Sequence, residues 1–152
     1  MNAIAVFEGK INGTVRFEEQ GRYTIIDIKL KGLSKNGLHG FHIHEAGDLT
    51  DKCESMCAHF NPYNKPHGGP ESKDRHVGDL GNLKTDKNGN VSIVMSDSMI
   101  KLKGKASIIG RGLIIHADED DLGLGTNTAS KINGNAGKRI ACAIIGIAKD
   151  NF

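Results

Sequence analysis

Hydrophobic and polar residues alternate along much of this chain with a period of two. The clearest case is 23–30, where Ile26 and Ile28 fall on one side and Asp27 and Lys29 on the other. Such alternation is typical of a β-strand with one buried face. With turn residues as boundaries, we expect further strands over residues 3–8, 14–18, 40–44, 81–85, 91–96, 113–116 and 140–148.

The last of these segments, 140–148, differs because it is apolar almost throughout. We expect it to be covered on both faces, by the core on one and by a second subunit on the other. The chain shows no helical periodicity and no internal repeat. About eight short strands in 152 residues predict one all-β domain over residues 1–152, either a sandwich or a barrel.

Two long segments interrupt the strand pattern. The first, 45–79, contains all three prolines, two of the three cysteines (Cys53 and Cys57) and three histidines. The second, 117–139, is rich in Gly, Asn and Thr. Long ordered loops in a compact domain are usually functional, and something other than a hydrophobic core must organise these two.

Composition excludes several classes of partner. The absence of Trp, the presence of only two Tyr and a net charge of +2 disfavour a nucleic-acid surface. No apolar stretch is long enough to span a membrane. The first residues lack the basic region of a signal peptide, and three cysteines are an odd number for a secreted disulfide framework. We therefore expect a cytoplasmic protein that binds neither nucleic acid nor membrane.

Candidate chemistry begins with His42 and His44, which project from the same face of the predicted strand 40–44. The pair alone is a weak signal, but the chain offers further metal ligands at His59, His67, His76, Asp79 and His116. Four imidazoles suit copper or zinc, and three imidazoles with a carboxylate suit zinc. Taken singly, each residue is as readily explained as a surface histidine or a turn aspartate.

Together, the motifs resemble those of the copper/zinc superoxide dismutases. They lie at residues 39–45, 59–62, 67–70, 75–81, 117–123 and 134–142, so the resemblance runs from end to end in the same order. It implies an eight-stranded Greek-key β-barrel with two long functional loops. It also implies dismutation of superoxide to dioxygen and hydrogen peroxide, by alternating reduction and reoxidation of one copper beside one zinc in each subunit.

The resemblance assigns roles position by position. The copper ligands correspond to His42, His44, His59 and His116, and the zinc ligands to His59, His67, His76 and Asp79. His59 is thereby implied to bridge both metals and to carry a proton. Asp120 matches a carboxylate that links His42 to His67, Arg139 matches the arginine that guides superoxide, and Cys53 with Cys142 matches an intrasubunit disulfide.

The chain departs from the family pattern at several positions. Thr128 and Ala129 replace a common pair of glutamates, and Lys131 lies one place early, so we expect a more positive approach to the copper. Cys57 replaces a small residue. Ala46 replaces a common aromatic residue at the implied homodimer interface, which includes Ile109-Gly110, Ile147 and the loop near Gly47.

Two further expectations concern partners and alternatives. A copper chaperone is a possible partner, but a proline associated with strict chaperone dependence is missing around 139–142, so we expect the chaperone not to be obligatory. The alternatives to an enzyme are a dismutase-like copper-delivery domain and a purely binding or structural β-sandwich. The complete ligand set disfavours the first, and the presence of Arg139 and Asp120 disfavours the second.

Overall fold

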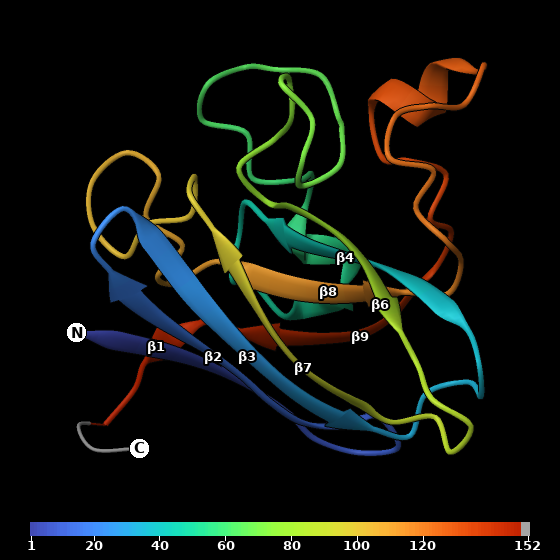
Figure 1. The fold of residues 1–152 in the computed structure, drawn as a ribbon, viewed down its shortest axis with the longest axis horizontal. Helices are drawn as coiled ribbons and strands as arrows, with labels where there is room; N and C mark the ends of the chain where they lie inside the picture. Colours follow the sequence, from blue (N-terminus) through green and yellow to red (C-terminus); the bar gives the residue numbers. More distant parts are fainter. Residues whose placement is uncertain (150–152) are drawn as a thin grey trace.

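The fold consists of two antiparallel β-sheets that face each other and enclose one hydrophobic core (Figure 1). The computed structural model describes residues 1–149; residues 150–152, which the single-domain prediction includes, lie outside the described part. The first sheet has the order β10-β1-β2-β3-β7 and comprises β1 (Asn2–Phe7), β2 (Asn12–Gln20), β3 (Tyr23–Lys31), β7 (Val91–Asp97) and β10 (Gly146–Ile147). The second has the order β6-β4-β8-β9 and comprises β4 (Leu38–His44), β6 (Asp79–Lys84), β8 (Gly112–His116) and β9 (Arg139–Ile144).

The alternating pattern of the sequence places the core between the two sheets. Along β3, Thr24, Ile26, Ile28 and Leu30 are buried, while the intervening residues are exposed or half-buried. These side chains pack with residues of the second sheet, such as Phe41, in a single apolar cluster. The all-β fold class is therefore confirmed. The two sheets contain eight strands if β9 and β10 are counted as one. The short strand β5 (Thr50–Cys53) belongs to neither sheet.

The final apolar segment is divided between the two sheets. The strand is interrupted at Ile145, whose N–H donates to Arg111 O and whose carbonyl accepts from Gly110 N–H. After this residue β10 pairs with β1, whereas β9 pairs with β8. Within the chain only one face of the segment is buried, since Ile144 is 42% exposed and Ile147 is 65% exposed. That a second subunit covers this exposed face stays a prediction.

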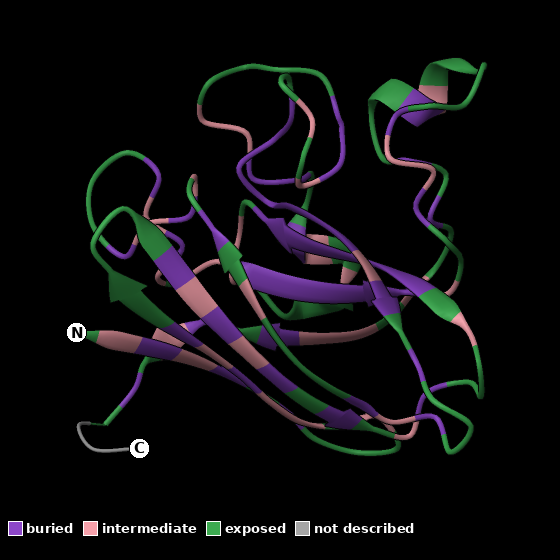
Figure 2. Cartoon of the chain, in the orientation of Figure 1, coloured by how far each residue is buried: buried purple, intermediate pink, exposed green. Residues whose placement is uncertain are grey.

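Two almost completely buried strands, β4 and β8, lie at the centre of the second sheet. The whole of β8, and all of β4 after its first residue, are buried (Figure 2). The first loop adds β5 and the short 3-10 turn η1 (Glu54–Met56), and the second adds the 3-10 turn η2 (Thr128–Lys131). Within residues 1–149 no helix has the length and apolar character that crossing a membrane requires.

A buried ion pair ties the first long loop to β7. Arg75 Nη1 donates to Asp97 Oδ2 at 2.6 Å, and both side chains are almost completely buried. The same guanidinium donates to the carbonyl oxygens of Pro70, His76 and Val77. One arginine therefore satisfies several backbone acceptors of residues 70–77, a segment that contains no strand.

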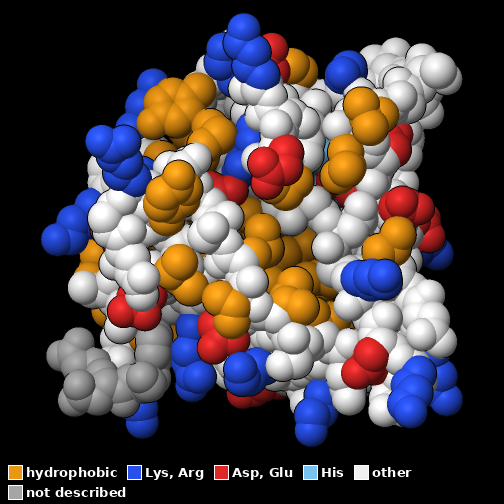
Figure 3. All heavy atoms as spheres, viewed as in Figure 1, with side chains coloured by type: hydrophobic (Ala, Val, Ile, Leu, Met, Phe, Trp, Pro, Cys, Tyr) orange, Lys and Arg blue, Asp and Glu red, His pale blue; other side chains and the backbone are white. Residues whose placement is uncertain are grey.

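The barrel is open on the side where β6 and β7 face each other. These strands are joined by a turn but belong to different sheets, each at its edge. Figure 3 shows apolar side chains in the hollow between them. A shallow cavity of about 540 Å³ lies there, lined in part by Leu80, Met95 and Leu122.

Candidate metal centre

The central strands β4 and β8 of the second sheet supply three imidazoles. His42 and His44 lie on the same face of β4, because alternate residues of a strand point the same way. His116 is the last residue of the neighbouring antiparallel β8. A fourth imidazole, His59, comes from the first long loop, which is held beside β4 by an isolated β-bridge to His44.

These four buried histidines share an unusual feature. In each of them one ring nitrogen is buried and has no hydrogen-bond partner, namely His42 Nδ1, His44 Nε2, His59 Nε2 and His116 Nε2. One nitrogen of each residue lies within 4.8 Å of the others. Buried polar atoms without partners are rare because they cost stability, so four that converge point to a missing ligand. Four imidazole donors suit a copper or zinc ion.

A second group of donors lies on the other side of His59. His59 Nδ1, His67 Nδ1 and His76 Nδ1 lie 3.0, 2.9 and 3.2 Å from Asp79 Oδ1, and His59 Nδ1 lies 3.1 Å from His76 Nδ1. Four atoms at the corners of a tetrahedron around zinc, bonded at about 2.0–2.1 Å, would lie roughly 3.3 Å apart. The observed separations are within a few tenths of an ångström of that value, so the residues fit the ion.

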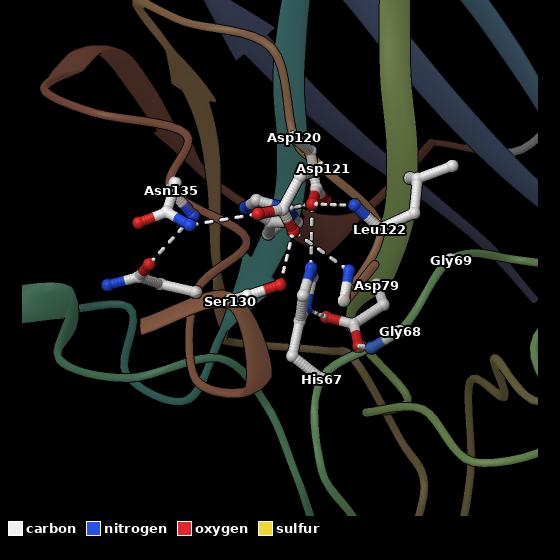
Figure 4. Close-up of polar contacts among 12 residues, drawn as sticks. His67, Gly68, Gly69, Asp79, Asp120, Asp121, Leu122, Ser130 and Asn135 are labelled. Atoms are coloured by element: carbon white, nitrogen blue, oxygen red, sulfur yellow. Dashed lines mark hydrogen bonds and ion pairs between the residues drawn. The ribbon is translucent and has the colours of Figure 1, made fainter. Parts of the chain in front are cut away.

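Asp120 joins the two groups through the outer nitrogens of two rings. Its Oδ2 lies 2.7 Å from His42 Nε2 and its Oδ1 lies 2.7 Å from His67 Nε2, and all three side chains are buried (Figure 4). Such a carboxylate keeps the outer nitrogens protonated and leaves the inner nitrogens free to bind metal. Burial raises the pKa of Asp120, but the hydrogen bonds with His42 and His67 outweigh this and lower the pKa to about 2.

Burial keeps most of the imidazoles neutral in the absence of metal. Desolvation is the main cause that lowers the pKa of His42 to about 3 and of His116 to about 4, and it also lowers the pKa values of His44 and His59. A neutral imidazole is the form that binds a metal ion. These rings are therefore ready to act as ligands at neutral pH.

His67 behaves differently because it lies between two carboxylates. Burial lowers its pKa, but Asp120 and Asp79 together raise the pKa to about 9. Asp79 shows the reciprocal effect: burial raises its pKa, while its contacts with His59 and other histidines lower the pKa overall. Without metal a proton on His67 balances the two carboxylates, and zinc binding would displace that proton.

Arg139 is fixed at the edge of a cavity that leads to the first group of histidines. Its Nη1 donates to Cys53 O at 2.9 Å and its Nη2 donates to Cys57 O at 2.6 Å. The cavity has a volume of about 300 Å³ and is lined by His44, His59, His116 and Arg139, among others. The structure therefore places a cation at the mouth of a small cavity that ends on three of the four converging imidazoles.

A disulfide fixes the segment that holds Arg139. Cys53 and Cys142 are bonded, with their Cα atoms 5.7 Å apart, which confirms the predicted pair. The bond joins the first long loop to β9, three residues after Arg139. Cys57 is a free, exposed thiol in a backbone conformation (φ 65°, ψ −138°) that favours glycine.

Several contacts that support the site could not be deduced from residue types. Cys57 O is close to both His44 Nδ1 (2.8 Å) and Arg139 Nη2, so a backbone atom orients two functional side chains. Asn82 and Asp120 exchange two hydrogen bonds through the amide side chain and the aspartate backbone. Gly134 has a left-handed φ of +69°, and a side chain there would collide with Asp120 Oδ1. The only sign in the sequence of this close approach between Gly134 and Asp120 is the glycine itself.

Comparison with known proteins gives matches over almost the whole chain. The family model described as copper/zinc superoxide dismutase matches residues 11–145. The Cu-Zn superoxide dismutase of Paramecium bursaria Chlorella virus 1 is 60% identical over 152 residues, which cover 100% of this chain and 81% of the relative. The extracellular Cu-Zn superoxide dismutase of Drosophila melanogaster is 52% identical over 140 residues, 91% of this chain and 77% of the relative. The crystal structure of the clock protein EA4 superposes with a TM-score of 0.93 at 42% identity, over 97% of this chain and 94% of that one.

Proposed function

This chain belongs to the copper/zinc superoxide dismutase family, and we propose that it converts superoxide to dioxygen and hydrogen peroxide at the metal centre described above. The observation that carries the proposal is the convergence of four buried, unpartnered imidazole nitrogens at the end of a cavity with a cationic mouth. A purely structural β-sandwich needs neither feature.

Each metal has its own set of ligands in this proposal. Copper is bound by His42, His44, His59 and His116, through the nitrogens that lack protein partners. Zinc is bound by His59, His67, His76 and Asp79, whose donor separations given above lie close to the edge length of a tetrahedron around the ion. His59 belongs to both sets because its two ring nitrogens face opposite groups.

Bound copper supplies one-electron chemistry, and bound zinc supplies charge and loop order without redox change. The side chains supply the rest. Arg139 offers a fixed positive charge, and its remaining N–H donors can face an anion in the cavity, because each terminal nitrogen uses only one hydrogen for a carbonyl. His59 can hold a proton at Nε2 beside the cavity and release it to a product. Asp120 holds the rings of His42 and His67 in place.

The test combines metal analysis with a superoxide assay. We expect one copper and one zinc per chain in the wild type, together with dismutase activity. His44→Ala should lose copper and activity but keep zinc, since His44 is absent from the zinc set, and the retained zinc is the control for folding. A wild type that carries both metals but has no activity would refute the proposal.

We also propose that the chain, one domain with a single core, forms a homodimer through the face around β9 and the loops beside it. Gly47 lies close to Gly110 O and to the side chain of Ile144, so two of the segments expected at the interface, the Gly47 loop and Ile109-Gly110, lie together beside β9. Leu49, two residues after Gly47, is 48% exposed and offers further apolar surface. Ala46 gives the interface less contact area than an aromatic residue would, so the dimer should dissociate at measurable concentrations in sedimentation analysis.

The remaining parts of the proposal concern compartment and copper supply. A cytoplasmic location is supported by Cys57, since an exposed free thiol persists best in a reducing compartment. The relatives from Drosophila melanogaster and Haemonchus contortus are named as extracellular, so fractionation of the source cells and medium is the test. Copper loading without a dedicated chaperone is tested by expression in cells that lack one.

A further inference from the structure

The two proposed sets of metal ligands are exposed to two different cavities. The cavity of about 300 Å³ beside Arg139 is lined by His44, His59 and His116, which belong to the copper set. A second cavity, of about 420 Å³, is lined by His59 and His76, which belong to the zinc set. We call the first the copper-side cavity and the second the zinc-side cavity. His59 is the one ligand that both cavities share.

A thin partition separates the two cavities. Besides His59, only Ala58 and Ile132 line both. Ile132, which follows directly after η2, is 58% exposed and forms part of the wall that the two cavities share. The end of η2 is held in place because His67 N–H donates to Lys131 O at 2.9 Å. The segment that carries Ile132 is therefore hydrogen-bonded to the backbone of His67, a residue of the zinc set.

The two mouths also differ in the chemistry of their walls. The zinc-side cavity is lined by Lys65 and Lys131, with Glu45 as its acidic residue. The copper-side cavity is lined by Arg139 and by the free cysteine, Cys57. His67 and Asp79 are 0–1% exposed and line neither cavity, whereas His76 is 6% exposed. Apart from His59, which both metals share, His76 is therefore the zinc ligand that faces the zinc-side cavity.

We propose that copper and zinc enter and leave this protein by separate routes, copper through the copper-side cavity and zinc through the zinc-side cavity. The inference rests on the ligand sets of the proposed function. Metal exchange proceeds by stepwise replacement of ligands, and replacement begins at the ligand that an incoming group can reach. Apart from the shared His59, the reachable ligand is His76 for zinc, and His44 or His116 for copper. Lys65 and Lys131 repel a divalent cation and slow its passage.

Cys57 makes a direct test possible on the metal-loaded protein, because its thiol is exposed beside the copper-side cavity. The wild type is labelled with fluorescein maleimide without reducing the disulfide. The converse variant carries C57S and K131C, so that its label lies at the zinc-side mouth. The control carries C57S and K87C, labelled in the turn before β7, away from both cavities. Release of zinc and of copper is followed with chromophoric chelators, using ascorbate to reduce copper.

We expect the label on Cys57 to slow copper release at least tenfold and to leave zinc release within twofold. The label on K131C should do the reverse, and the K87C control should change neither rate. Independently, the unlabelled variant K131E should release and take up zinc several-fold faster with no change for copper. These rates do not depend on enzymatic activity.

Three results would overturn the inference: a label at one mouth that slows both metals equally, labels that slow neither, or an equal effect from the K87C control. The first result would mean that both metals use a common route, and the second that they leave by opening of the loops. Protein that binds no copper or zinc before labelling would instead contradict the proposed function, so the two failures are distinguishable.

Discussion

Replacing Asp120 by asparagine tests the link between the two ligand groups. The carboxylate makes two contacts of 2.7 Å, to His42 Nε2 and His67 Nε2. Both imidazoles must carry their proton on Nε2 if Nδ1 is to bind metal, so both are donors towards Asp120. An asparagine offers one acceptor oxygen and one NH₂ group, and the NH₂ group would face an N–H. Asp120→Asn therefore loses one of the two hydrogen bonds.

The magnitude follows from the charge of the carboxylate. A hydrogen bond to a charged group contributes about 1.5–3 kcal/mol. Because each 1.36 kcal/mol is a factor of ten, zinc or copper affinity should fall roughly 10- to 150-fold. The affected metal depends on which ring loses its partner, so both affinities are measured, by competition of the metal-free protein with chromophoric chelators.

The control is Glu119→Gln, which makes the same change of charge at the exposed neighbouring residue. It should leave both affinities within twofold. If Asp120→Asn bound both metals as tightly as the wild type does, the carboxylate would not orient the ligands, and the reasoning would be refuted.

The other predictions concern electrostatics and stability. Activity should fall as ionic strength rises, because salt screens the positive cavity mouth, and a flat profile in a stopped-flow superoxide assay would contradict this. Arg75→Met should cost about 3–5 kcal/mol in urea unfolding because it leaves Asp97 buried without its partner, whereas Lys65→Ala, at an exposed pair, should cost less than about 1 kcal/mol; equal costs would contradict the burial argument. In the metal-free protein, His42 and His116 have folded-state pKa values near 3 and 4, below the usual 6.5, so the unfolded chain binds more protons between about pH 4 and 6.5. The unfolding free energy should therefore fall as pH drops through that window, and equal urea midpoints at pH 7 and pH 5 would contradict it.

The strand pattern could be predicted from sequence wherever one face of a strand meets the core. The alternation in 23–30 corresponds to β3, whose buried positions are those that the pattern indicates. The pattern could not reveal the break at Ile145, because that break is set by hydrogen bonds to Gly110 and Arg111 from a distant loop. Short β5 inside the first loop was missed for a different reason: it carries no core residues and shows no alternation.

The site residues were found by motif, but their arrangement required coordinates. Spacing alone places His42 and His44 on one face, and the structure adds that their unpartnered nitrogens differ, Nδ1 in one and Nε2 in the other. Backbone atoms such as Cys57 O have no sequence signature, although they orient His44 and Arg139. Nor could sequence show that Ile132 lines two cavities, because that depends on how the end of η2 is held.

The pairing of β1 with β10 has a consequence for biosynthesis. β1 comprises residues Asn2–Phe7 and β10 residues Gly146–Ile147, so the first sheet cannot be completed until residue 147 has left the ribosome. Cys142 and Arg139 lie in the same late segment, and the disulfide spans 89 positions. Contacts this distant in sequence slow folding, and unpaired strand edges promote aggregation in the interval. A nascent chain stalled shortly before residue 139 should thus be the species that most depends on chaperone protection.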